Sequence, residues 1–365
     1  MVIDEQLLYK IWNHVEKETS ETNHLNLSNI MICGKTGVGK SSLINAIHRE
    51  EVCKTGIVPT TFDFNFNKIS KEIFNINFID VPGFGELKNL NHTHNIDIIN
   101  ITNKIEAYQP SIILLVVKCD DNALNLEIKF LEHITQNYKI NRIPIIIAIN
   151  QIDKAKPLKF WDPQKVNLIN PNKPKEINIV KYIQYLKSIK SFKNININNF
   201  FPICSGELYN DNNIYGINDL ILCFYNNVSD EYKLCYSKVF KLHAYESNRI
   251  INKLLSMNSV YNDSKTILML YFVRLVKYLS IVYNLNVSNL NQIIKFINFI
   301  NLNEIIKSFF ELMPSKLNHN KIEQFLLLKI FIGNVIVDLF SANVKVINES
   351  YIASKLKKIY QIKIA

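Results

Sequence analysis

A glycine-rich segment near the start of the sequence carries the residue types needed to bind phosphate. The apolar run Ile30–Cys33 continues into residues 34–42, GKTGVGKSS, after which a helical pattern begins. Glycines at this spacing let a loop wrap closely enough for its backbone N–H groups to point inward, and the following helix adds its positive dipole end. We expect Lys40 to reach the β- and γ-phosphates of a nucleotide, and the Ser41 hydroxyl to bind Mg²⁺.

Two further segments would complete the magnesium end of this site. Asp80 closes an apolar run and is followed by Val81, Pro82 and Gly83. A carboxylate at the end of the strand beside the phosphate loop is where Mg²⁺ takes an outer ligand, and the Gly83 N–H would contact the γ-phosphate. Thr61 ends a polar stretch without strand or helix pattern, so a loop there could bring its hydroxyl to Mg²⁺. An ordinary loop or strand start is the alternative for this threonine taken alone.

A second polar cluster selects the base. Asn150, Gln151 and Asp153 follow a buried apolar run, and a carboxylate at Asp153 can accept both the N1–H and the N2–H of guanine. Adenine lacks that donor pair, and a site built for such hydrogen bonds strongly rejects a ligand without them. The Ser205-Gly206 pair, at the end of the last apolar run, would offer a backbone N–H to guanine O6.

In order and spacing, the motifs GKTGVGKS, PTT, DVPG, NQID and SGE resemble those of the translation-factor-like P-loop GTPases, within them the Era-like and immunity-related branch. The resemblance covers roughly residues 29–230 and implies GTP or GDP and Mg²⁺ as ligands, with slow hydrolysis. It assigns catalysis to Lys40, Thr61 and Gly83, and Mg²⁺ to Ser41, Thr61 and Asp80. The expected nucleotide contacts are Gly34, Gly37, Val38, Gly39, Lys40, Ser41, Ser42, Asp80, Gly83, Asn150, Gln151, Asp153, Ser205 and Gly206.

The sequence departs from that family's pattern at four places. Gln151 replaces the lysine whose stem packs on the guanine face, and the last motif has Gly206-Glu207 in place of Ala-Lys. Phe84 replaces a water-orienting glutamine, so we expect a group from a partner, a second protomer or another loop to assist hydrolysis. Gly37 replaces the asparagine found in relatives that use potassium, which argues against that ion here.

The apolar pattern predicts an α/β domain followed by an all-α domain. Continuous runs such as Ile112–Val117 are typical of strands covered on both faces, which indicates a mostly parallel sheet flanked by helices. After about residue 231 the strand pattern stops and only Gly333 remains of the glycines. We expect an N-terminal helical extension over 1–28, the GTP-binding domain over 29–230 with a basic, proline-rich insertion near 154–193, and a helical domain over 231–365. The expected helices of that last domain are 236–256, 265–284, 289–300, 303–312, 321–340 and 349–360.

Composition leaves several partners open. The net charge of +10 is carried mostly by lysine, and a solvated surface is favoured over a patch for nucleic acid or membrane. The six cysteines form no C-x-x-C pair, which favours the reducing cytoplasm, and no apolar stretch is long enough to span a bilayer. We expect a guanine nucleotide as ligand and no DNA partner, and leave open a homodimer through the GTP-binding domain, a ribosome or RNA partner, a peripheral membrane site and a scaffold that does not hydrolyse.

The helical tail and a histidine pair each admit two interpretations. Around 267–279, apolar residues share one helix face while Arg274 and Lys277 project elsewhere, which fits a packed bundle or a helix on a membrane surface. The tail also faintly resembles the helical domain of some bacterial membrane-associated GTPases. His92 and His94 could hold a metal, but without a third ligand nearby two solvated loop histidines are favoured.

Overall fold

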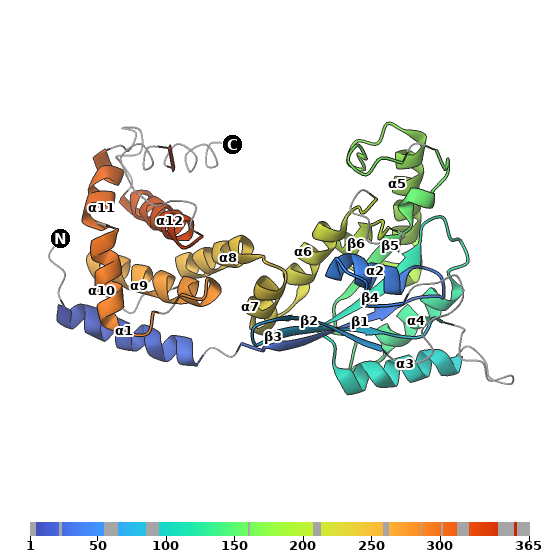
Figure 1. Ribbon diagram of the computed structural model, residues 1–365, viewed down its shortest axis with the longest axis horizontal. Coiled ribbons are helices and arrows are strands. Elements are labelled where there is room, and N and C mark those ends of the chain that lie inside the picture. The colour runs from blue at the N-terminus through green and yellow to red at the C-terminus, as the bar shows by residue number, and fades with distance from the viewer. Residues whose placement is uncertain are drawn as a thin grey trace. The chain divides into compact units, whose positions relative to one another are not determined.

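The computed structural model divides the chain into two compact units, shown as a ribbon in Figure 1. One unit runs from His24 to Phe240, and the other combines residues 1–23 with 241–365. The residues described are 5–21, 24–54, 65–84, 95–159, 161–206, 213–257, 263–285, 287–300, 302–311, 321–341 and 354–355. Thr61, His92, His94 and Glu207 lie outside them, as does nearly all of the expected helix 349–360.

The His24–Phe240 unit is built on a six-stranded sheet in the order β2-β3-β1-β4-β5-β6. All neighbouring strands are parallel except β2, which pairs antiparallel with β3 at the edge. The chain first forms β2 and β3 on one side of β1, and then crosses to form β4 on the other side. The strands are β1 (Leu27–Cys33), β2 (Asn65–Lys71), β3 (Phe74–Asp80), β4 (Ile112–Lys118), β5 (Ile145–Asn150) and β6 (Phe200–Pro202). Such a reversal of strand order leaves a crevice at the carboxyl ends of the strands.

Helices cover both faces of this sheet, which explains the continuous apolar runs of its central strands. Met31 and Cys33 of β1 face a core formed with α3, α4 and α5, whereas Ile30 and Ile32 face the opposite side. There α2, α6 and α7 pack. The helices are α2 (Lys40–His48), α3 (Asn95–Tyr108), α4 (Asn125–Gln136), α5 (Pro174–Ser188), α6 (Ile217–Asn227) and α7 (Asp230–Val239). The predicted fold class, a mostly parallel α/β domain with a helical region after it, is therefore confirmed.

Helix α5 begins at Pro174, inside the segment 154–193 that the sequence indicated as a basic, proline-rich insertion. Pro174 occupies its first turn, where a missing N–H costs nothing, and the Glu176 carboxylate accepts the backbone N–H of Lys173 at 3.1 Å. The lysine- and proline-rich insertion is thus a loop over residues 155–173 that leads into a capped helix.

The second unit consists of helices alone in the part of the chain that is described. Its members are α1 (Glu5–Ser20), α8 (His243–Ser256), α9 (Ser264–Val282), α10 (Leu290–Phe299), α11 (Leu302–Glu311) and α12 (Lys321–Phe340). Helix α9 is central: α1, α8 and α12 all pack against it. Arg274, only 6% exposed, forms an ion pair with Glu18 of α1, and Lys277 lies 2.9 Å from Glu16. The interpretation of this segment as a membrane-surface helix is therefore wrong, because both faces of α9 are occupied by other helices of its own unit.

The expected helix 236–256 is two helices. Helix α7 ends at Val239, Lys241 adopts a left-handed conformation with φ of 58°, and α8 begins at His243. Helix α7 packs on β1, β2 and β3. The buried Tyr236 hydroxyl lies within hydrogen-bond distance of Ser28 (3.1 Å) and Ser111 (2.9 Å). The compact unit that holds the sheet therefore ends at Phe240, ten residues beyond the boundary expected from the loss of strand pattern.

The N-terminal helix also differs from its expected place as a separate extension, because α1 packs on α9 and α10. Within the described residues, we find no helix that combines the length and the apolar character needed to cross a bilayer.

Candidate nucleotide site

The loop between β1 and α2 has the backbone conformation that a phosphate-binding loop needs. Gly34, Gly37 and Gly39 have φ of 146°, 77° and 91°, values that residues with a side chain rarely adopt. A Cβ on Gly34 would lie 2.3 Å from the Val116 carbonyl oxygen of β4. The loop therefore lies directly against the central strands, and glycine is required there for both conformation and space.

Lys40 and Ser41 begin α2 at the end of this loop. The Lys40 ammonium is buried and donates to the carbonyl oxygens of Gly34 (3.2 Å) and Lys35 (3.1 Å), so its charge lies over the loop. The Ser41 hydroxyl donates to an Asp80 carboxylate oxygen at 2.9 Å. Strands β1 and β3 are parallel neighbours, and this places the first turn of α2 beside the end of β3. One hydroxyl and one carboxylate oxygen next to a phosphate-binding loop form a donor set that fits Mg²⁺, which prefers oxygen ligands.

Gly83 closes the other side of the loop. A Cβ at Gly83 would lie 2.3 Å from the Thr36 hydroxyl and 2.6 Å from its backbone nitrogen, so any side chain would displace the phosphate loop. The next residue, Phe84, donates its N–H to the Gly34 carbonyl at 3.2 Å. The Phe84 ring is 4% exposed and packs on Phe130 of α4, with ring centroids 5.1 Å apart. This side chain is part of the core and does not face the loop.

Asn150 at the end of β5, expected as a nucleotide contact, connects the phosphate loop with the last motif. Its side-chain amide donates to the Val38 carbonyl (3.0 Å) and lies 3.1 Å from the Ser205 hydroxyl, while its oxygen accepts the Ser205 N–H at 3.2 Å. Asn150 is completely buried, and a Cβ on Gly39 would approach its amide nitrogen to 2.4 Å. Its side chain thus fixes the phosphate loop to the last motif, a positioning role that the sequence did not reveal.

Gln151 and Asp153 continue from β5 along the same edge. Gln151 has φ of 60° and donates its side-chain amide to the Gly37 carbonyl at 2.9 Å, so it lies across the phosphate loop. Asp153 is half-buried in the short 3₁₀ turn η1 (Ile152–Lys154), and its carbonyl accepts a hydrogen bond from the Lys175 ammonium. Gly206, with φ of 71°, follows the buried Ser205.

Two cysteines lie behind this end of the site. Burial is the largest cause that raises the pKa of both Cys119 and Cys204 to about 12. Both thiols therefore remain neutral at physiological pH and act as small apolar groups.

The structure brings nearly all the expected site residues to the carboxyl ends of β1, β3, β5 and β6. These are Gly34, Gly37, Val38, Gly39, Lys40, Ser41, Ser42, Asp80, Gly83, Asn150, Gln151, Asp153, Ser205 and Gly206. Thr61, the third expected metal ligand, lies outside the described residues.

Comparison with known proteins identifies the fold that carries this site. Residues 29–151 match the family described as 50S ribosome-binding GTPase. GTPase Era of Mycoplasma genitalium is 31% identical over 158 residues, which cover 41% of this chain and 51% of the relative. The probable GTP-binding protein EngB of Campylobacter jejuni is 35% identical over 109 residues, or 28% of this chain and 54% of the relative.

Residues 29–151 of this chain are thus similar to GTPases of the Era and EngB kind. The chain spans about half the length of the curated relatives it matches. Among solved structures, Era of Aquifex aeolicus bound to GDP and aluminium fluoride overlaps 56% of this chain and 58% of its own, with TM-score 0.39 and 20% identity. Toc33 of Arabidopsis thaliana with Mg²⁺ and GMPPNP overlaps 65% of this chain and 92% of its own, with TM-score 0.40 and 15% identity.

The His24–Phe240 unit contains a further charged contact that the sequence does not indicate. The Lys35 ammonium lies 3.3 Å from Asp121 and 3.2 Å from Glu127 of α4. The Glu127 side chain is 1% exposed, and its burial raises its pKa above the ordinary range despite the neighbouring lysine. Lys35 occupies a variable position of the loop motif, so no sequence signal marks it. Its side chain ties the phosphate loop to α4.

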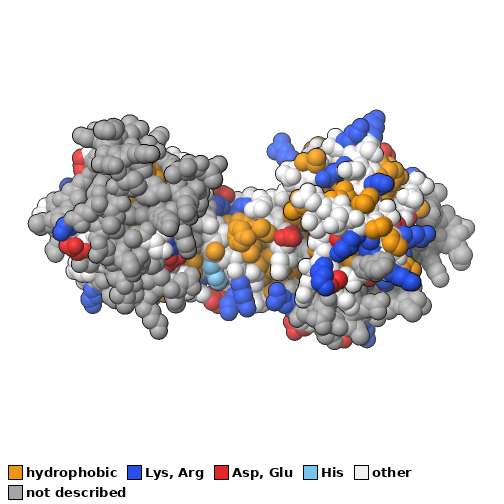
Figure 2. Space-filling view, turned by 90° about the horizontal axis from the view of Figure 1, so that it is seen from above, with side chains coloured by type: hydrophobic (Ala, Val, Ile, Leu, Met, Phe, Trp, Pro, Cys, Tyr) orange, Lys and Arg blue, Asp and Glu red, His pale blue; other side chains and the backbone are white. Residues whose placement is uncertain are grey.

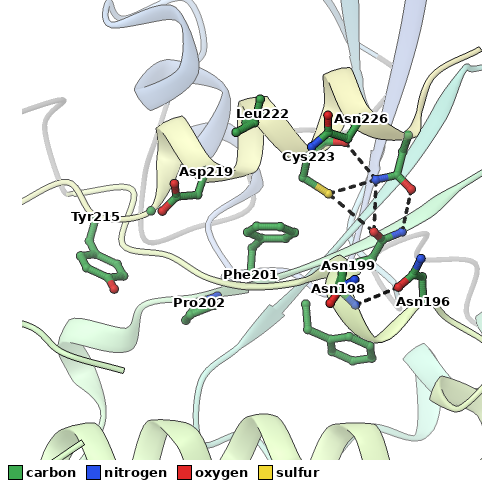
Figure 3. A pocket seen from close by; sticks show the side chains of 13 residues that line it. Asn196, Asn198, Asn199, Phe201, Pro202, Tyr215, Asp219, Leu222, Cys223 and Asn226 are labelled. Carbon is green, nitrogen blue, oxygen red and sulfur yellow. Dashed lines mark hydrogen bonds between the residues drawn. The ribbon is translucent and has the colours of Figure 1, made fainter. Parts of the chain in front are cut away.

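A cavity of about 610 Å³ lies elsewhere in the His24–Phe240 unit, between β6, the turn η3 (Ile197–Asn199) and α6 (Figure 3). None of the expected nucleotide-binding residues lines it. The amides of Asn199 and Asn227 bond to each other at 3.1 Å, and Cys223 lies 3.7 Å from Asn199. These polar groups satisfy one another, so the cavity wall does not present them to a ligand.

Proposed function

We propose that this protein is a Mg²⁺-dependent GTP-binding switch that hydrolyses GTP slowly. The observation that carries the proposal is the position of Asn150, whose side chain bonds both the phosphate loop and Ser205 of the last motif. Through it, the phosphate-binding end and the base-reading end form one hydrogen-bonded unit. This arrangement suits a ligand that has phosphates at one end and a purine at the other.

At the phosphate end, the chain supplies positive charge and metal ligands. Lys40 and the loop N–H groups would neutralise the phosphate oxygens, while Ser41 and Asp80 would hold Mg²⁺. When bound, Mg²⁺ supplies charge neutralisation between the β- and γ-phosphates. Because Gly83 carries no side chain, its backbone can lie close against the phosphate loop, where its N–H would contact the γ-phosphate. Thr61 is proposed as the additional metal ligand from its position in the motif order alone.

At the base end, Asp153 selects guanine. Its carboxylate would accept the N1–H and N2–H of the base, with Gln151, Ser205 and Gly206 around it. The Lys175 contact to the Asp153 carbonyl fixes the backbone from which this carboxylate projects. The Gln151 side chain donates a hydrogen bond to the Gly37 carbonyl. It would provide a smaller surface for stacking on guanine than a lysine stem.

Slow hydrolysis follows from the position of Phe84. Its ring is buried against Phe130 and has no group able to orient an attacking water. We therefore propose that a partner or a second copy of the GTPase domain supplies the missing group. The same observation favours a second candidate function, a nucleotide-binding scaffold that does not hydrolyse.

Two measurements test these proposals together. Fluorescent GDP and ADP are titrated into the full chain with Mg²⁺ and with excess chelator, and phosphate release from GTP is then followed. We expect guanine-selective binding that weakens without Mg²⁺, followed by slow release of phosphate. Equal affinity for ADP would refute the guanine assignment. Guanine binding without any phosphate release, even at high protein concentration, would favour the scaffold.

A further inference from the structure

The loop between η1 and α5, residues 155–173 and called here the insertion loop, exposes two aliphatic side chains. Ile169 is 90% exposed and Leu158 is 72% exposed. Single exposed apolar residues are common on protein surfaces. Two in one loop call for an explanation when the loop is fixed and two of its other apolar side chains, Trp161 and Leu168, pack against the core.

The insertion loop is held in place from beneath by two buried charged residues of α5. The Glu176 carboxylate accepts backbone N–H groups from Asn167, Asn172 and Lys173, each at 3.1 Å. Lys175, only 3% exposed, donates to the carbonyls of Asp153 and Leu158. The backbone on which Leu158 and Ile169 are mounted is therefore organised before any partner binds.

The loop also contains apolar residues that do pack inward. Trp161 and Leu168 contact the core cluster of the sheet, and the Trp161 ring makes an edge contact with Tyr215. The Lys175 ammonium lies 5.8 Å from the centre of the same ring. Two side chains of the loop therefore pack on the core, while the same loop conformation directs Leu158 and Ile169 outward.

Lysines surround the two exposed aliphatic residues along the chain. Lys154, Lys156, Lys159 and Lys165 are exposed. Asp162 pairs with Lys165 at 2.9 Å and offsets that one charge, and Glu176 is buried, so the exposed Lys154, Lys156 and Lys159 keep the loop region basic. Figure 2 looks onto the side of the molecule that carries α5 and shows Lys and Arg side chains interleaved with hydrophobic ones on the GTPase domain.

We propose that the insertion loop docks on an anionic phospholipid surface, with Leu158 and Ile169 entering the interface and the lysines facing the headgroups. Aliphatic side chains and flexible lysines are the composition that binds such a surface, since the stems of lysines lie along apolar material while their charges remain at the headgroups. Single-stranded RNA is bound instead by exposed aromatic rings and arginines. Residues 154–193 contain no arginine, and the Trp161 ring is occupied by Tyr215 and Lys175.

Vesicle flotation with the full chain tests this proposal. We expect the protein to float with vesicles of about three parts phosphatidylcholine to one part phosphatidylserine, and not with phosphatidylcholine alone. The double substitution Leu158→Ser with Ile169→Ser should weaken binding to the anionic vesicles roughly tenfold. Lys156→Gln with Lys159→Gln should weaken it as well, and added salt should weaken binding of the unmodified chain.

Ile73→Ser provides the matched control. Ile73 is 64% exposed in the same unit, but it lies in the turn between β2 and β3, at the opposite edge of the sheet. We expect this variant to float like the unmodified protein, and all variants to unfold at the same temperature. The proposal fails if the unmodified chain does not float with anionic vesicles, or if the double serine variant floats as well as Ile73→Ser does.

Binding to ribosomal RNA is measured on the same set of variants. If the lysine substitutions abolish RNA retention while the double serine substitution changes neither RNA retention nor flotation, the loop is an RNA surface and the lipid proposal is overturned. None of these outcomes depends on nucleotide binding, so a failure of the proposed GTPase function would be seen separately.

Discussion

The Ser41 hydroxyl donates a hydrogen bond to the Asp80 carboxylate at 2.9 Å, although the two residues lie 39 positions apart. The contact exists because α2 begins at the carboxyl end of β1 and β3 is the parallel neighbour of β1. A small hydroxyl and a carboxylate at this place are what a magnesium site beside a phosphate loop requires.

This contact leads to a prediction for Asp80→Asn and Ser41→Ala. In each variant the affinity for GDP in the presence of Mg²⁺ should fall roughly 10- to 100-fold, because each substitution removes an oxygen that holds the ion. Lys40→Ala should weaken nucleotide binding with or without Mg²⁺, since it removes the cation on the phosphates. Fluorescent-GDP titration with Mg²⁺ and with excess chelator separates the two effects. Affinities like those of the unmodified protein for all three variants would show that the phosphate site is misplaced.

Asn150→Ala should destabilise the His24–Phe240 unit itself. The substitution leaves the Val38 carbonyl and the Ser205 N–H without their buried partner, and we expect it to lower the free energy of unfolding by about 2–4 kcal/mol. Urea denaturation without nucleotide measures this. Asn198→Ala is the control because Asn198 is exposed, and it should change the unfolding free energy little. A loss for Asn150→Ala no greater than that of the control would contradict its positioning role.

Asp153→Asn should exchange GTP for xanthosine triphosphate. Xanthine carries a carbonyl acceptor in place of the 2-amino donor of guanine, and an asparagine amide can donate to it where a carboxylate would repel it. An unpaired buried polar group costs about 1–3 kcal/mol, and more if charged, so competition binding should resolve the switch. Undiminished GTP binding by this variant would indicate that Asp153 only stabilises the turn after β5.

Hydrolysis of GTP should be slow in dilute protein and rise with protein concentration or with an added partner. Phe84 is buried against Phe130, so the attacking water has no side-chain orienter at this position. In comparable GTPases, a catalytic group supplied by a partner raises the rate of GTP hydrolysis by as much as ~10³–10⁵-fold. Phosphate release per molecule, measured over a range of concentrations, checks this. Fast turnover independent of concentration would argue against it.

Tyr236→Phe should show that α7 is part of the same folded unit as the sheet. The substitution removes the hydroxyl that lies within hydrogen-bond distance of Ser28 and Ser111 at the starts of β1 and β4, and should cost about 1–3 kcal/mol of stability. Chemical denaturation of the full chain measures this loss of stability when unfolding is monitored by a probe in the His24–Phe240 unit. Tyr245→Phe, at an exposed position of α8, is the matched control. Equal stability of the two variants would place the domain boundary before α7.

The sequence by itself determined the fold class and the position of the site along the chain. Continuous apolar runs such as Ile112–Val117 identify strands buried on both faces, and the motif at 34–42 needs a strand before it and a helix after it, which β1 and α2 provide. These features are local, because strand burial and loop geometry depend on residue types at short spacing.

Only the tertiary structure decided which side chains face a ligand and which support them. Asn150 and Ser205 are 55 residues apart, yet their hydrogen bonds join two motifs that the sequence presents as separate. Tyr236 lies 208 residues from Ser28, and that contact extends the compact unit to Phe240. Phe84 looks like an altered catalytic position in the sequence, but its contact with Phe130 makes it part of the core. Such contacts depend on how the strands are ordered in the sheet, and spacing along the chain does not encode that order.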